Sequence, residues 1–442
     1  MPVFADRYRR LSDIAHYLVD PRVGIVPYLA EQPREFALPE FFHYASQACR
    51  TEAFAPHRNF RAAGGAAIDR SRAVARAIGE AVERYCGAIY EPRDLLIVSA
   101  NDAAFACADP DAFALYGRSQ YDDPSFIFVP FDRNTPVAWV SAVSAMTGET
   151  VHVPAAMVYV PYVYYRASGD QPIVQPVSTG LACHVSRAEA VISAACEVIE
   201  RDAFSIVWQA MLSPPQIDRE TLDAENRGIV DRFTAAGGDV TLFDLSFVDV
   251  PTVLAVLRHP SEHRPPLTFA ASTDVDPAVA VRDALEEVAH THRYMQHILE
   301  GMPRLDPDPT MSSIVDQESH LNFWCDRSNT DRADFLFCST ERRAFGDLPN
   351  CTAGNAESDL RALVNRIAAS GHELLVADVT TPDVGELGLT VVRAIIPGFH
   401  PLFWNYRYRA LGGRRLWTLP QAMNYPGITP GGGDNPIPHP YP

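Results

Sequence analysis

The sequence predicts a mixed α/β fold in which helices pack on mixed sheets. Three long helical patterns, over residues 68–90, 186–209 and 277–300, alternate with short runs of β-branched and aromatic residues that are typical of strands. No linker-like stretch separates these segments, so one large domain is expected over residues 1–420, with residues 1–60 as its lead-in. A Pro- and Gly-rich tail over residues 421–442 follows it.

Start signals mark the long helices. Scattered prolines in the lead-in predict only short helices and turns before the first of them. Asp69 or Ser71 can cap the first long helix, whose apolar residues recur at the three- and four-residue spacing of one helix face. The second begins at Ser186, with Glu189 three residues later, as in a capping box. The third opens at an Asp-Pro pair, and proline is favoured at the first helical position.

Strands are expected in three stretches. Residues 125–165 contain the runs FIFVPF, AWVSAV and MVYVPYVYY, broken by turns. The runs TLFDLSF, TVLAVLRH and LTFAAST lie between the second and third long helices. Near the end, a shorter helical pattern over residues 356–371 precedes the runs LLVADV and TVVRAII. Because helices and strands alternate, the sheets should be mixed.

Composition excludes several classes of function. The chain contains no lysine, so all 37 basic residues are arginine, and 55 acidic residues give a net charge of -18. This charge argues against nucleic acid and anionic membranes as main partners. Phosphate charge must be met by arginine, backbone N–H groups or metal, because no Walker-type lysine exists. The chain has neither a long apolar run nor a signal core, and its cysteines are scattered singly, so a cytoplasmic protein without disulfides is expected.

A repeated motif, Glu-x-x-Glu-Arg, is the main candidate for a site. Its two copies contain Glu80, Glu83 and Arg84, and Glu197, Glu200 and Arg201. Helical spacing places the three charges of each copy on one face. A single copy would ordinarily be a solvated face with ion pairs, but the recurrence and the apolar residues around Glu197 favour a buried site. Two such helices facing each other could hold a divalent cation and phosphate, with Glu189 on roughly the face of Glu197.

The third helix and the tail carry further signals. Glu286, Glu287, His290, His292 and Arg293 lie in that helix. The histidine spacing is not that of a metalloprotease, and a partly exposed helix end is the ordinary interpretation, although Arg293 could reach a phosphate. The closing PIPHPYP favours an extended polyproline II rod. Such a tail can be frayed, bind a proline-recognition module, or insert into a pocket and place its carboxylate there.

These motifs resemble the YcaO family, and within it the azoline-forming cyclodehydratases, or D proteins, of thiazole/oxazole-modified peptide biosynthesis. The resemblance covers most of the chain and rests on the two Glu-x-x-Glu-Arg motifs together with PIPHPYP. The matching stretches are GGAAIDRSRAVARAIGEAVERYCG (64–87), TPVAWVSAVSAMTGETVHVPAAMVYVPY (135–162), STGLACHVSRAEAVISAACEVIERDAF (178–204) and DVDPAVAVRDALEEVAHTHR (274–293).

The resemblance implies a YcaO-type fold with ATP and Mg²⁺ between the glutamate-bearing helices. By similarity, the metal ligands would be Glu80, Glu83, Glu197 and Glu200. The nucleotide contacts would be completed by Arg84, Glu189, Arg201, Glu287 and Arg293. Expected catalytic groups are Glu197, Arg201 and the carboxylate of Pro442, because the tail of this subgroup enters the active site.

The resemblance also implies ATP-driven cyclodehydration. A Cys, Ser or Thr side chain of the precursor peptide attacks the preceding amide carbonyl, ATP phosphorylates the resulting oxygen, and phosphate leaves to give a thiazoline or oxazoline. The implied partners are the precursor peptide, a separate E1-like leader-binding protein, a second copy of the chain and, in some systems, a flavin dehydrogenase. A thioamide- or amidine-forming relative and a non-catalytic nucleotide-binding scaffold are the alternatives.

The chain departs from the family at three positions. Gly64-Gly65-Ala66 stands where the family has a Gly-Lys-Gly element, Arg76 replaces a common serine, and Ser193 replaces a common glutamine. The changes fit a chain without lysine, and all four motif glutamates remain.

Overall fold

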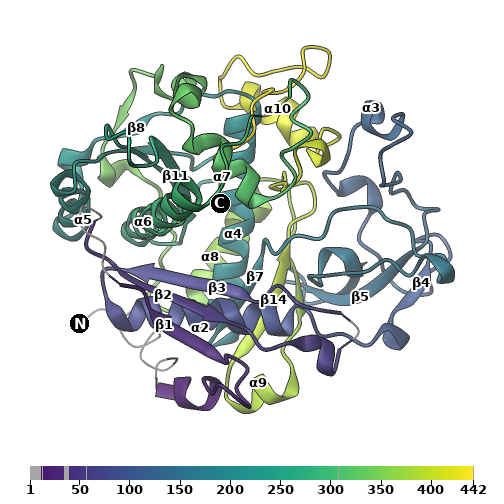
Figure 1. Cartoon of the computed structure of the whole chain (residues 1–442). Coiled ribbons are helices and arrows are strands. Elements are labelled where there is room, and N and C mark those ends of the chain that lie inside the picture. Colours follow the sequence, from purple (N-terminus) through teal and green to yellow (C-terminus); the bar gives the residue numbers. More distant parts are fainter. Residues whose placement is uncertain (1–10, 12, 34–38, 56, 307, 442) are drawn as a thin grey trace.

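In the computed structural model, which describes residues 11, 13–33, 39–55, 57–306 and 308–441, the strands form three sheets (Figure 1). The first contains, in spatial order, β1 (Tyr28–Glu31), β2 (Phe42–Gln47) and β3 (Ala62–Ala67). The second contains β11 (Leu267–Thr273), β10 (Thr252–Arg258), β9 (Asp239–Asp244), β8 (Gln216–Ile217) and β12 (Arg342–Arg343). The third contains β4 (Leu96–Val98), β5 (Val137–Ser144), β13 (Leu375–Asp378), β14 (Thr390–Ile395) and β7 (Leu181–His184), with β6 (Thr150–Pro154) beside β5. Only the β8–β12 pairing is parallel among these described strands, so only the second sheet is mixed, and the strands of the other two sheets pair antiparallel.

Each long helix packs mainly on a different sheet. α2 (Arg70–Cys86) packs on β3, α6 (Pro277–Gly301) on β11 and β10, and α4 (Arg187–Gln209) on β14. The predicted caps are present, because Asp69 accepts the N–H of Arg72 at 3.0 Å and Ser186 accepts the N–H of Glu189 at 3.3 Å. The three helices therefore meet where the sheets adjoin, with α4 at the centre of the molecule (Figure 1).

Shorter helices complete the layers around this centre. Their bounds are α3 Arg118–Tyr121, α5 Ala224–Ala235, α7 Gln317–Cys325, α8 Ala356–Ala369, α9 Pro382–Glu386 and α10 Arg414–Ala422. The second half of α4 is largely buried, including its polar residues Asp202, Ser205 and Gln209. Its Phe204 and Trp208 are fully buried with Phe269 and Trp324. None of the described helices is both long and apolar enough to cross a membrane. All eight cysteines are free thiols, although Cys338 is exposed.

Residues 435–441 of the C-terminal tail are largely buried against α4 and α7 instead of being frayed, whereas residues 421–434 are mostly exposed. The indole N–H groups of Trp208 and Trp324 donate to the carbonyl oxygens of Ile437 and Pro438 at 2.9 and 3.0 Å. Tyr441 is only 1% exposed. These contacts satisfy the carbonyl groups of a polyproline-like segment, which has no internal hydrogen bonds of its own.

Three predictions of secondary structure are wrong. The lead-in contains the paired strands β1 and β2 and not only short helices and turns. The segments FIFVPF (126–131) and MVYVPYVYY (157–165) contain no strand. Their aromatic rings pack on one another instead: Phe126 and Phe128 pack against Tyr116 and Tyr408. The hydroxyl of Tyr162 donates to Asp170 at 2.6 Å. Aromatic clustering and side-chain hydrogen bonds replace the ladder that β-propensity alone suggests.

Candidate active site

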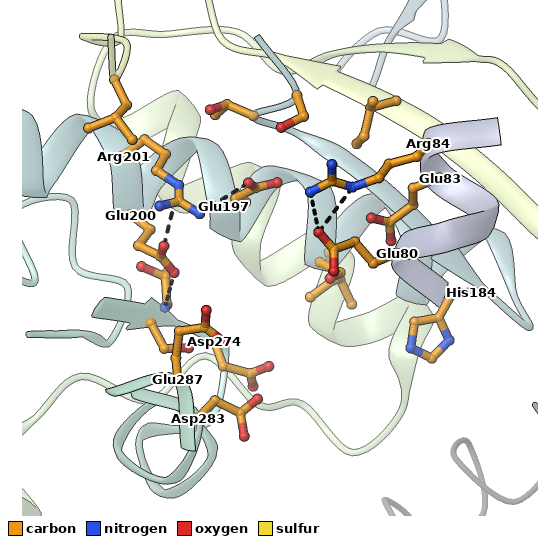
Figure 2. A pocket seen from close by; sticks show the side chains of 18 of the residues that line it. Glu80, Glu83, Arg84, His184, Glu197, Glu200, Arg201, Asp274, Asp283 and Glu287 are labelled. Atoms are coloured by element: carbon orange, nitrogen blue, oxygen red, sulfur yellow. Dashed lines mark hydrogen bonds and ion pairs between the residues drawn. The ribbon is translucent and has the colours of Figure 1, made fainter. Parts of the chain in front are cut away.

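A cavity of about 420 Å³ lies where α2, α4, the end of β11 and α6 meet (Figure 2). Both Glu-x-x-Glu-Arg motifs face it, as the sequence predicts. Its carboxylates are Glu80, Glu83, Glu189, Glu197, Glu200, Asp274, Asp283 and Glu287. Among the lining residues, the only basic side chains are those of Arg84, Arg201 and His184. The cavity is therefore strongly acidic.

The carboxylates of α2 are held in two ways. Glu80 accepts the N–H of Gly64 at 2.8 Å and is paired with Arg84 at 2.6 Å. Glu83 is half-buried and accepts the N–H of Cys183, near the end of β7, at 2.8 Å. Burial raises the pKa of Glu83 to about 8, and the nearby Glu197 and Glu80 carboxylates add to the rise.

The carboxylates of α4 are held by loops and by the tail. Glu197 accepts the N–H of Gly180 at 2.8 Å and is paired with Arg201 at 3.3 Å. Glu200 accepts the N–H of Thr273 at 3.2 Å and the hydroxyl of Tyr441 at 2.5 Å. Burial raises the pKa of Glu200 to about 7, although Arg201 opposes the rise.

The remaining predicted residues divide between two cavities. Glu189 lies at the start of α4, where it accepts the hydroxyl of Ser186 at 2.9 Å and is paired with His184 at 3.1 Å. Glu287 lines the same cavity. Arg293 lines an adjoining cavity, and its guanidinium donates to the carbonyl of Pro33 at 3.0 Å. Pro442 lies outside the described residues.

Asp283, Asp274 and Tyr441 are among the functional candidates in the two cavities that were not predicted from the sequence. Asp283 precedes Glu287 by four residues, so helical spacing alone could have identified it. It is paired with Arg76 at 2.8 Å, and that arginine also reaches Glu286 at 3.0 Å. Spacing within one segment does not identify Asp274, in the loop after β11. Nor does it identify Tyr441, which lines the adjoining cavity. Only the packing of distant segments places these two residues here.

The donor set fits a magnesium–nucleotide complex. Among the described residues, no three His, Cys, Asp or Glu side chains converge closely enough to form a closed metal site. Mg²⁺ in nucleotide sites is typically held by one or two carboxylates together with phosphate oxygens and water. The pKa values of Glu83 and Glu200 are raised in this acidic cavity, and a bound cation would stabilise their ionised carboxylates. The buried Nη1 of Arg201 has no hydrogen-bond partner in the described part of the chain, so it remains available to a phosphate oxygen.

Glu83→Gln is expected to stabilise the nucleotide-free protein at alkaline pH. The pKa of about 8 lies above the ordinary 4.5, so the folded protein keeps a proton that the unfolded chain has lost. That contribution to stability is present at low pH and is lost as pH rises through about 8. Glutamine carries no charge, so the thermal unfolding midpoint at pH 9 should exceed that of the wild type by a few degrees, and its pH dependence should weaken. A lower midpoint at pH 9, with the exposed variant Glu357→Gln unchanged, would contradict this.

Comparisons with known proteins identify the family of the chain. The family model described as YcaO cyclodehydratase, ATP- and Mg²⁺-binding, matches residues 64–400. An uncharacterized protein of Methanothermobacter thermautotrophicus is 28% identical over 343 residues, which cover 76% of this chain and 80% of that protein.

Two solved structures share the fold. A heterocyclase in complex with substrate and cofactor superposes with a TM-score of 0.79 at 20% identity, over 98% of this chain and 57% of that chain. The YcaO protein of Methanopyrus kandleri bound with AMPPCP and Mg²⁺ gives a TM-score of 0.64 at 22% identity, over 89% and 90% of the two chains. This chain thus spans little more than half of the heterocyclase.

Proposed function

The chain belongs to the YcaO cyclodehydratase family, and we propose that it is an ATP-dependent cyclodehydratase subunit that converts Cys, Ser or Thr of a precursor peptide to thiazoline or oxazoline. The observation that carries this proposal is the meeting of both Glu-x-x-Glu-Arg motifs in one acidic cavity (Figure 2). The catalytic domain would comprise residues 1–420, and residues 421–442 would serve as its inserted tail.

Four glutamates would hold the metal and the phosphates. These are Glu80, Glu83, Glu197 and Glu200, supported by Glu189 and Glu287 on the cavity wall. Bound ATP would supply the phosphoryl group that turns the amide-derived oxygen into a leaving group. Arg84 and Arg201 would neutralise phosphate charge in place of a lysine, and Arg293 would reach the nucleotide only from the adjoining cavity.

Proton transfer is the remaining task of the protein. The attacking thiol or hydroxyl and the amide nitrogen must each lose a proton, so a base must lie beside the peptide. Glu197 and Arg201 lie on the cavity wall, and Pro442 directly follows Tyr441, which lines the adjoining cavity. We assign Pro442 as the base or orienting group through its terminal carboxylate, with Glu197 and Arg201 acting on the phosphoryl group.

The partners follow from the same reaction. A precursor peptide is the substrate, and a separate E1-like protein would bind its leader and activate this subunit. A homodimer within a larger cytoplasmic complex, and a flavin dehydrogenase that oxidises the ring, complete the proposal.

The test is the mass of the peptide. The purified chain is mixed with ATP, Mg²⁺, the E1-like protein and the precursor encoded beside it. The expected product has lost one water per ring, with one ADP released for each ring. Exchange of the amide oxygen for sulfur when sulfide is added to the same mixture would show a thioamide former instead. Nucleotide binding without any change in the peptide, in the presence of a competent partner, would indicate a scaffold.

A further inference from the structure

Tyr441 of the tail contacts the second Glu-x-x-Glu-Arg motif. The hydroxyl of Tyr441 donates to Glu200 Oε1 at 2.5 Å and accepts the N–H of Ala271 at 3.3 Å. Its ring lies under the guanidinium of Arg201, whose central carbon is 4.3 Å from the ring centroid. One side chain of the tail therefore contacts both the carboxylate of Glu200 and the guanidinium of Arg201.

Glu200 and Arg201 have few other partners. Without Tyr441, the carboxylate of Glu200 retains the N–H of Thr273 at 3.2 Å and an ion pair with Arg201 at 3.6 Å. Arg201 retains its pair with Glu197 at 3.3 Å, while its Nη1 is buried without a hydrogen bond among the described residues. A buried carboxylate oxygen that has lost its hydrogen-bond donor is costly. Loss of the hydroxyl would therefore favour rotation of the Glu200 carboxylate toward the guanidinium of Arg201.

Tyr441 cannot adopt this position unless the tail is docked. Upstream of it, Trp208 and Trp324 hold the carbonyl groups of Ile437 and Pro438. His439 is buried and interacts with the carbonyl of Phe403 at 2.7 Å through Nε2. The tail is thus fixed over several residues before it reaches the motif, so the position of Tyr441 reports whether the tail is in place.

We propose that Tyr441 is a positioning residue through which docking of the tail and binding of the magnesium–nucleotide complex strengthen each other. The inference rests on the proposed function, because the cavity must bind nucleotide. The hydroxyl occupies Glu200 Oε1 and keeps the ion pair of this atom with Arg201 at a long 3.6 Å. The carboxylate then stays available to the metal and the guanidinium to phosphate. A coupling between two binding events is reciprocal, so the nucleotide must also hold the tail in place.

Calorimetric titration of the full chain with Mg²⁺ and AMPPCP tests the first half. Tyr441→Phe keeps the ring and its contact with Arg201 but removes the hydroxyl, and should weaken binding about tenfold, as expected for a hydrogen bond to a charged group. Tyr162→Phe is the matched control, because it also removes a buried hydroxyl that donates to a carboxylate, Asp170, at 2.6 Å, outside the cavity. The control should lose similar thermal stability and bind like the wild type.

Hydrogen exchange of residues 435–441 tests the second half and needs no variant. Mg²⁺ with AMPPCP should slow exchange in the wild type and have a much smaller effect in Tyr441→Phe. Equal affinity of Tyr441→Phe and the wild type, or exchange in the wild-type tail that nucleotide leaves unchanged, would overturn the inference. Failure of the wild type to bind Mg²⁺ and AMPPCP at all would instead contradict the proposed function, so the two failures are distinguishable.

Discussion

Glu197→Gln is expected to lower the rate of ATP-dependent ring formation by about hundredfold or more. The substitution keeps the shape of the side chain, and its amide oxygen can still accept the N–H of Gly180. What it removes is one negative charge between the two motif helices, at the position where the metal and phosphates are proposed to bind. Initial rates of ADP release with the peptide and its partner measure the effect.

Two controls separate the charge from the fold. The thermal midpoint of Glu197→Gln should stay near that of the wild type, because Arg201, which forms an ion pair with this carboxylate, keeps its second ion pair with Glu200. Glu357→Gln, at the exposed start of α8, should retain full activity. A Glu197→Gln protein that folds and turns over at the wild-type rate would exclude this glutamate from the metal and phosphate site.

Deletion of residues 435–442 is expected to abolish ring formation and to destabilise the whole fold by at least about 3 kcal/mol. The deletion uncovers Trp208 and Trp324 and leaves their indole N–H groups without the carbonyl groups of the tail. It also removes Tyr441, one of the largest fully buried side chains. Thermal and urea unfolding of the purified protein measure the loss.

Deletion of Pro442 alone separates chemistry from stability. The contacts of Trp208, Trp324 and Tyr441 with residues 435–441 remain available, so the unfolding midpoint should not change. The terminal carboxylate moves back by one residue, about 3 Å, which is enough to remove a base from its substrate. If the shortened protein forms rings at the normal rate, the terminal carboxylate is not the base.

Helices and their caps could be predicted because the signals are local. Asp69 and Ser186 cap α2 and α4 through backbone N–H groups three residues away, and the acidic faces follow from the helical period. The meeting of the two motifs in one cavity was an inference from their recurrence, and it is confirmed.

Other features depend on contacts between distant segments. The aromatic runs around Phe126 and Tyr162 have strong β-propensity, but their rings pack with each other and with residues far along the chain, such as Tyr408. Tyr441 reaches Glu200 across 241 positions of sequence separation. No spacing rule within one segment can identify such a pair, so only the structure could show which residue of the tail contacts the motif.

In the proposed reaction, ATP phosphorylates the oxygen of a peptide amide in the cavity between α2 and α4. The most direct measurement uses a precursor peptide whose amide oxygen before the cyclised residue carries a heavy isotope. If the enzyme phosphorylates that oxygen, the released phosphate must contain the label, one labelled phosphate for each ring. Rings that form while the phosphate stays unlabelled and the label appears in water would contradict the claim, because ATP would then serve another purpose than activating the amide.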